Sequence, residues 1–256
     1  MMQFKKYNKY FFTFWKDNLL KVIIYIVLVP CITFICLYTN TLVYIRKELH
    51  ISLADFLITT GNSILFYINL MFIPCILLSL MIRQNFSLNN IIRHKSKRIL
   101  FCSYVYYGFL LSLFTSLYQF ISSSIIGYTL SDSLINFDQS HSIFWFVNQG
   151  ICSSVTFIEV LCYTFIFCFL YSCLLILIYL ILKWFLFYDL IGILFLIILG
   201  LCDIYGGIGL CRLIGTSYVN LITYHPIYLL ILCVGILICG CISIIFSRKR
   251  EFLHES

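Results

Sequence analysis

The chain has 256 residues, of which 62% are hydrophobic and only 11% are charged. A soluble domain carries about 25% charged and about 45–50% apolar residues, and a globule of this size buries only ~70–75% of its unfolded surface. The composition therefore argues against soluble, disordered and collagenous proteins. The net charge of +7 does not indicate nucleic-acid binding, because the cations cluster between apolar runs, as they do in membrane proteins.

Six apolar stretches approach or exceed the ~20 residues that a helix needs to cross the hydrocarbon core. We expect an all-α membrane protein, with residues 1–256 forming one transmembrane domain. Fourteen of the 17 Lys and Arg residues lie in segments that a six-helix layout places on one side, which predicts that both termini are cytoplasmic. The predicted helices cover about 20–45, 56–82, 99–131, 150–182, 184–202 and 227–247.

The residues before the first apolar stretch have the pattern of an interfacial helix. Over 4–19, aromatic residues such as Phe4, Tyr7 and Phe11 share one helical face, and Lys5 and Lys9 lie on another. This pattern is typical of an amphipathic helix in the headgroup plane. The alternative is a basic tail that only orients the first membrane helix.

The inner loop after the second stretch, residues 84–97, is predicted to form a short basic helix with an apolar stripe. Ser87 is a suitable N-cap, and Leu88, Ile91 and Ile92 recur at helical spacing beside Arg93 and Lys95. Such a stripe fits a groove on another protein. The alternative is that it lies on the membrane surface beside the N-terminal helix.

Residues 203–226, between the fifth and sixth stretches, contain four glycines yet remain largely apolar. Backbone that enters a membrane without spanning it is tolerated only where protein covers its polar groups. We therefore expect a re-entrant segment here.

Uncharged polar residues recur on one face of two predicted membrane helices. Small polar residues at such spacing commonly serve helix–helix packing. The alternative is a face that lines a solute pathway between two protomers, and the two roles are compatible if the same faces form a dimer interface. The candidate residues are Asn62 and Asn69 on the second helix and Ser112, Ser116, Gln119 and Ser123 on the third.

No catalytic, metal or cofactor site is expected in the chain. Glu159 is flanked by apolar sequence on both sides, but it lies near a helix end, where a helix-start or packing role is favoured over a pathway role. The five histidines fall in loops or tails, and no HExxH, GxSxG or GxxxxGK[ST] motif occurs. The alternative is a membrane enzyme centred on Glu159 with His141 or His225, and the missing second deep titratable group argues against it.

The whole layout resembles the type-2 ABC exporter permease family, especially the short six-helix permeases of bacteriocin and lantibiotic self-protection. An amphipathic segment, two helices, an inner loop, three helices, a Gly-broken segment and a last helix before Arg248-Lys249-Arg250 carry the resemblance. It implies a multi-pass permease of the bacterial cytoplasmic membrane that pairs with a second permease, identical or different.

The resemblance also implies a separate ABC ATPase subunit, which would bind ATP and Mg²⁺ and dock on residues 84–97. The exported substrate would be hydrophobic or peptidic, such as a bacteriocin or another antimicrobial peptide. The rival interpretation is a stand-alone membrane immunity or scaffold protein that binds its partner without transport.

Overall fold

The structure is a computed structural model, and it describes residues 16, 19–61, 66–85, 97–186, 189–205 and 225–246. This part of the chain is helical and contains no strand beyond two isolated bridges. Nearly all of the predicted interfacial helix over 4–19 lies outside the described residues. So do 86–96, which carry the predicted docking stripe, and 206–224, most of the predicted re-entrant segment.

The helices differ from the predicted ones mainly in the second and fourth apolar stretches. The predicted helix over 56–82 corresponds to three elements, the middle one a π-helix, with 62–65 outside the described residues. The helix predicted from 150 begins at Phe157. In chain order the elements are α2 (Leu19–Ile45), α3 (Leu53–Gly61), η1 (Phe66–Phe72), α4 (Ile73–Asn85), α6 (Lys97–Leu130), α7 (Ile143–Val147), α8 (Phe157–Leu186), α9 (Asp189–Tyr205) and α12 (His225–Phe246).

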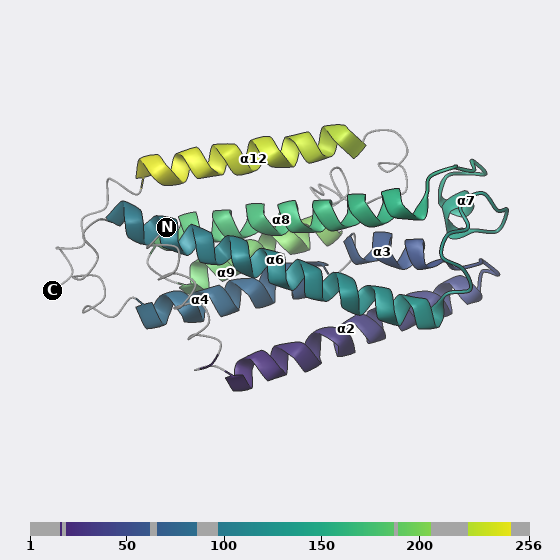
Figure 1. Ribbon diagram of the computed structural model, residues 1–256, viewed down its shortest axis with the longest axis horizontal. Coiled ribbons are helices and arrows are strands. Elements are labelled where there is room, and N and C mark those ends of the chain that lie inside the picture. The colour runs from purple at the N-terminus through teal and green to yellow at the C-terminus, as the bar shows by residue number, and fades with distance from the viewer. Residues whose placement is uncertain are drawn as a thin grey trace.

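The long helices lie along the long axis of an elongated bundle (Figure 1). Helix α8 occupies the centre and packs against α3, α6, α9 and α12. Helix α2 packs mainly on α6, and α12 packs mainly on α8. The short helix α7 and its flanking loops form one end of the bundle.

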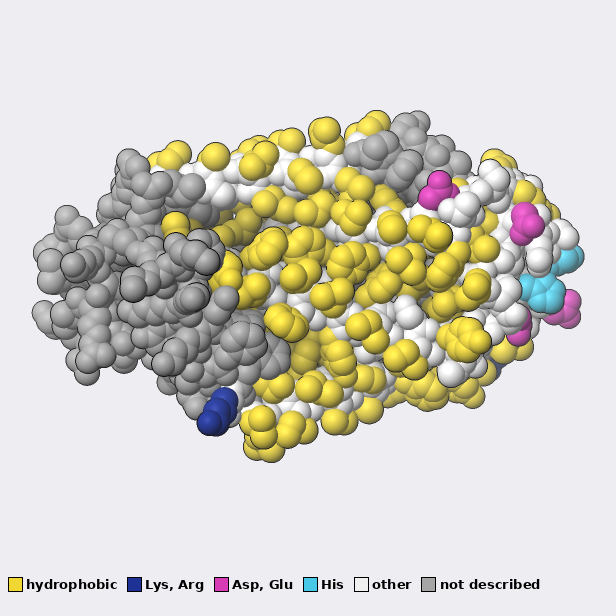
Figure 2. Space-filling model, in the orientation of Figure 1, with side chains coloured by type: hydrophobic (Ala, Val, Ile, Leu, Met, Phe, Trp, Pro, Cys, Tyr) yellow, Lys and Arg dark blue, Asp and Glu magenta, His cyan; other side chains and the backbone are white. Residues whose placement is uncertain are grey.

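Apolar side chains cover the middle of the bundle, as expected for a surface that faces lipid. Figure 2 shows hydrophobic residues over this region, whereas acidic residues and histidines gather at the end that carries α7. Within the described part, three helices are long and apolar enough to cross a membrane: Leu19–Ile45, Leu100–Leu130 and Phe157–Trp184. The apolar helices Tyr67–Leu80 and Leu229–Ile242 are shorter. These spans indicate a membrane protein.

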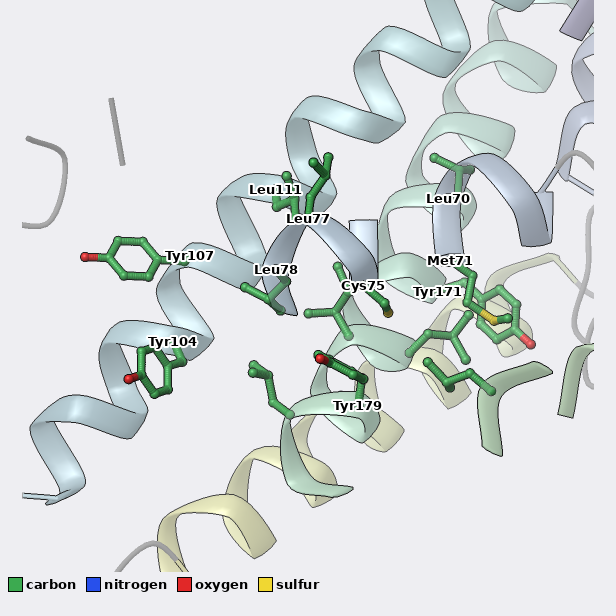
Figure 3. Packing of buried hydrophobic residues seen from close by; sticks show 14 of the residues in the cluster. Leu70, Met71, Cys75, Leu77, Leu78, Tyr104, Tyr107, Leu111, Tyr171 and Tyr179 are labelled. Atoms are coloured by element: carbon green, nitrogen blue, oxygen red, sulfur yellow. The ribbon is translucent and has the colours of Figure 1, made fainter. Parts of the chain in front are cut away.

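The larger apolar core lies between η1, α4, α6, α8 and α9. Figure 3 shows residues of this core from three elements: Cys75 and Leu78 from α4, Tyr104 from α6 and Tyr179 from α8. Gly108 allows α6 and α8 to approach closely, because a Cβ atom there would lie 2.7 Å from Ile176 Cγ2.

A second apolar core closes the end that carries α7. It joins the last turns of α2 and the start of α3 to Phe137, Ile143 and Phe144. The first N–H groups of α3 are satisfied here, because Leu53 N donates to Ser133 O at 2.9 Å and Ala54 N donates to Leu134 O at 3.1 Å. This end of the bundle therefore fixes where α3 begins.

Candidate functional site: a buried polar cluster between α2, α3, η1 and α6

Uncharged polar side chains from four elements meet inside the apolar bundle. Each is at most 1% exposed. Burying such groups is unfavourable unless they bond to one another, so their convergence makes this the candidate site. The polar cluster consists of Thr33 from α2, Thr60 from α3, Asn69 from η1, and Gln119 and Ser123 from α6.

Gln119 is the centre of the polar cluster. Its Oε1 accepts from Asn69 Nδ2 at 2.8 Å, and its Nε2 donates to Ser123 Oγ at 3.0 Å and to Thr33 Oγ1 at 3.2 Å. Thr60 Oγ1 continues the chain of bonds to Ser123 Oγ at 3.0 Å. One side chain of α6 is thereby bonded to α2 and η1, and through Ser123 to α3.

Local sequence explains why these side chains point inward. On α2 the buried residues recur every three or four positions, and Thr33 lies between Val29 and Leu37 on that stripe. Thr33 Oγ1 also lies 2.7 Å from the carbonyl of Val29, a bond that satisfies a hydroxyl within its own helix. Asn69 lies in a π-helix, a conformation that occurs frequently at functional sites.

The structure places the predicted polar face of α6 inside a single chain. Ser112 and Ser116 are buried, as are Gln119 and Ser123. Asn69 joins them through Gln119. The residues therefore pack helices of one protomer together, and a role in a solute pathway or a dimer interface stays a prediction. Asn62 lies outside the described residues.

Glu159 lies apart from the polar cluster, in the first turn of α8. Its Oε2 accepts from Thr156 N at 2.8 Å and from Thr156 Oγ1 at 3.0 Å, and Thr156 Oγ1 in turn accepts from Glu159 N at 3.4 Å. These reciprocal bonds form a capping box. The capping box accounts for the presence of a carboxylate at position 159 and for the start of α8 at Phe157.

Sequence reasoning missed Thr33 and Thr60, and it missed Asp55. Asp55 is buried at the start of α3, where its Oδ2 accepts from Ser52 N at 2.8 Å and from Ser52 Oγ at 2.7 Å. The signal was present, since a Ser three residues before an acidic residue predicts a helix N-terminus. Thr33 falls on the buried stripe of α2, but the helix is apolar on every face in the sequence, so the stripe is recognised only in the structure.

The polar cluster has donors and acceptors but no charge, so it suits hydrogen bonding to a neutral molecule rather than proton transfer. Among the described residues no group of three or more His, Cys, Asp or Glu side chains is arranged to hold a metal ion. No protein-family model, curated protein or solved structure matches the chain. The function must therefore be argued from the sequence and the site.

Proposed function

We propose that the chain is the permease subunit of an exporter that moves a hydrophobic or peptidic molecule out of a bacterial cytoplasmic membrane. The observation that carries this proposal is the polar cluster, which lies deep in an apolar bundle and includes a residue of the π-helix η1. Polar groups at membrane depth are costly and usually functional. An Asn and a Gln at this depth can serve helix packing, and their cost also makes them candidates for a role in transport.

The proposal includes a six-helix layout with both termini in the cytoplasm and a partner that supplies the energy. The second proposed span consists of α3, η1 and α4 together. Each of the other five spans is a single helix: α2, α6, α8, α9 and α12. The sequence contains no nucleotide-binding motif, so ATP would be hydrolysed by a separate subunit. Residues 84–97 would transmit the movement of that subunit to α4 and α6, which flank them.

The experiment is copurification of the chain with an ATPase from its own cell. The double variant Leu88→Asp/Ile91→Asp places charge on the predicted stripe, and we expect it to abolish copurification and ATPase stimulation. The matched control is Asn89→Asp/Asn90→Asp, which adds the same charge to the same segment away from the stripe. Retained complex formation in the stripe variant would disprove the docking assignment.

A protein that binds its partner in the membrane without transport is the second candidate. The observation that favours it is the complete burial of the polar cluster within one chain, because such bonds also hold a rigid bundle together. This candidate predicts that protection against a membrane-active toxin persists when the ATPase is removed, whereas an exporter loses it.

A further inference from the structure

Helix α7 is apolar at every position, but the second apolar core uses only part of it. Ile143 and Phe144 are fully buried in that core, whereas Phe146 is 50% exposed and Val147 is 45% exposed. We call Phe146 and Val147 the α7 flank. Exposed apolar side chains next to each other are unfavourable in water, so the α7 flank calls for an apolar neighbour.

The α7 flank lies beside the C-terminal end of α2. Lys47 Nζ lies 5.1 Å from the centre of the Phe146 ring, and Lys47 N donates to Tyr44 O at 3.0 Å, directly after the last turn of α2. Tyr44 packs against the second apolar core, to which Phe144 also belongs. The exposed apolar surface of α2 extends as far as Ile45, which is 60% exposed. The α7 flank therefore continues the lipid-facing surface of α2.

The length of α2 sets the depth of the α7 flank in the membrane. Helix α2 has 27 residues and is therefore about 40 Å long, whereas the hydrocarbon core is about 30 Å thick and the bilayer with its headgroups is about 40–45 Å thick. Both ends of α2 thus reach the headgroup region, and the α7 flank lies at the level of the C-terminal end. Aromatic rings gather at this level, and Lys side chains place an apolar stem along them and a charged head in the polar layer.

The size and chemistry of this surface favour lipid over a second protein. A stable protein interface buries about 800 Å² on each partner, and two half-exposed side chains with one ammonium group fall far short of that. Neither side chain of the α7 flank can form a hydrogen bond that would select a protein partner. A phospholipid supplies both complements, because its acyl chains suit Phe146 and Val147 and its phosphate suits Lys47.

We propose that the α7 flank and Lys47 form an interfacial lipid contact, which enters the phospholipid bilayer at the level of the headgroups. Phe146 and Val147 contact the glycerol backbone and the first acyl carbons, and the Lys47 ammonium lies at the phosphates. The connection between α6 and α8 is thereby held at the membrane surface and does not project into water. This contact does not depend on the proposed transport function or on an ATPase.

The test is photocrosslinking of the full chain in vesicles made of equal parts of phosphatidylglycerol and phosphatidylethanolamine. The photoreactive residue p-benzoylphenylalanine replaces Phe146, and in a second protein it replaces Val147, so that a folding defect at one position leaves the other available. The lipid control is position 35, because Ile35 is 60% exposed near the middle of α2. The water control is position 139, because Gln139 is exposed in the polar run 138–141.

We expect lipid adducts from positions 146 and 147 at a yield similar to that of position 35, and none from position 139. Mass spectrometry of the adducts should locate the new bond at the glycerol or the first acyl carbons for positions 146 and 147, and at the middle of an acyl chain for position 35. Absence of lipid adducts at both positions of the α7 flank overturns the proposal, as do adducts at mid-chain carbons. A protein adduct that replaces the lipid adduct when whole cells are irradiated also overturns it.

A second arm tests the role of Lys47 with the probe kept at position 146. Lys47→Glu places a negative charge at the phosphates and should reduce the yield of lipid adduct, whereas Lys47→Arg keeps the positive charge and should retain the yield. An unchanged yield in Lys47→Glu overturns the placement of Lys47 at the phosphates.

Discussion

Replacing Gln119 by Leu tests whether the polar cluster holds the bundle together. Leu has a similar volume but cannot bond, so the variant removes the bonds to Asn69, Ser123 and Thr33. Asn69 Nδ2 would keep only its long contact of 3.4 Å with Thr33 Oγ1. A buried group left without a partner costs about 1–3 kcal/mol, and hydrogen bonds between membrane helices average about 0.6 kcal/mol. We therefore expect Gln119→Leu to lower the free energy of unfolding by about 1–3 kcal/mol.

The assay is reversible unfolding of the purified chain in mixed micelles of increasing SDS content, followed by circular dichroism. The companion variant Asn69→Leu/Gln119→Leu removes both partners of the shortest inter-helix bond in the polar cluster. Because replacing both members of a buried pair leaves fewer unsatisfied groups than replacing one, the double variant should lose less stability than the sum of the two single variants.

Two results would refute this reasoning. If Gln119→Leu changes the free energy of unfolding by less than about 0.3 kcal/mol, the hydrogen bonds of the polar cluster are no stronger than those that the same groups form in the unfolded state in micelles. Additive losses in the double variant would mean that Asn69 and Gln119 act independently, which contradicts their 2.8 Å bond.

The remaining predictions concern close packing and the start of α8. A Cβ atom on Gly127 would lie 3.1 Å from Phe56 Cβ, so Gly127→Ala should destabilise the bundle by about 1–3 kcal/mol in the same unfolding assay. Gly240→Ala is the control and should change stability by less than about 0.5 kcal/mol, since nothing lies within 4 Å of its added Cβ. Thr156→Ala removes a capping box and should cost about 1 kcal/mol. Glu159→Gln keeps an acceptor for Thr156 and should leave both stability and function intact. Loss of function in this variant would instead favour a membrane enzyme centred on Glu159.

Hydropathy alone was enough to predict a helical protein with membrane-spanning segments. Leu19–Ile45 and Phe157–Trp184 are long, apolar and free of interior charge, and such runs admit few other structures. Helical spacing alone also places Ser112, Ser116, Gln119 and Ser123 on one face. The structure places that face in the interior of the chain.

The second apolar stretch shows what hydropathy cannot resolve. Residues 66–72 are as apolar as an α-helix of a membrane protein, yet they form a π-helix. The choice between the two depends on how the backbone is packed against α6 and α8, which leaves no mark in a single sequence. The start of α8 is a different case, because the Thr-x-x-Glu pattern at 156–159 predicts a helix N-terminus and could have corrected the boundary.

The partners of the polar stripe could not be predicted either. Spacing tells which residues of one helix share a face, but it does not tell which other helix that face meets. Gln119 bonds to Asn69 and Thr33, which lie 50 and 86 residues away in the sequence. Only tertiary packing brings these three side chains together.

The attachment of α2 follows from the difference between lipid and water as a solvent. In a bilayer, lipid tails compete with protein for apolar surface, so helices associate through van der Waals packing and interhelical hydrogen bonds and not through the hydrophobic effect. Helix α2 exposes much of its apolar surface and packs mainly on α6. Its bonds to α6 add to the packing of its buried residues, such as Val29 and Leu37, and they are those of Thr33 with Gln119 and of the Tyr118 hydroxyl with Ile26 O.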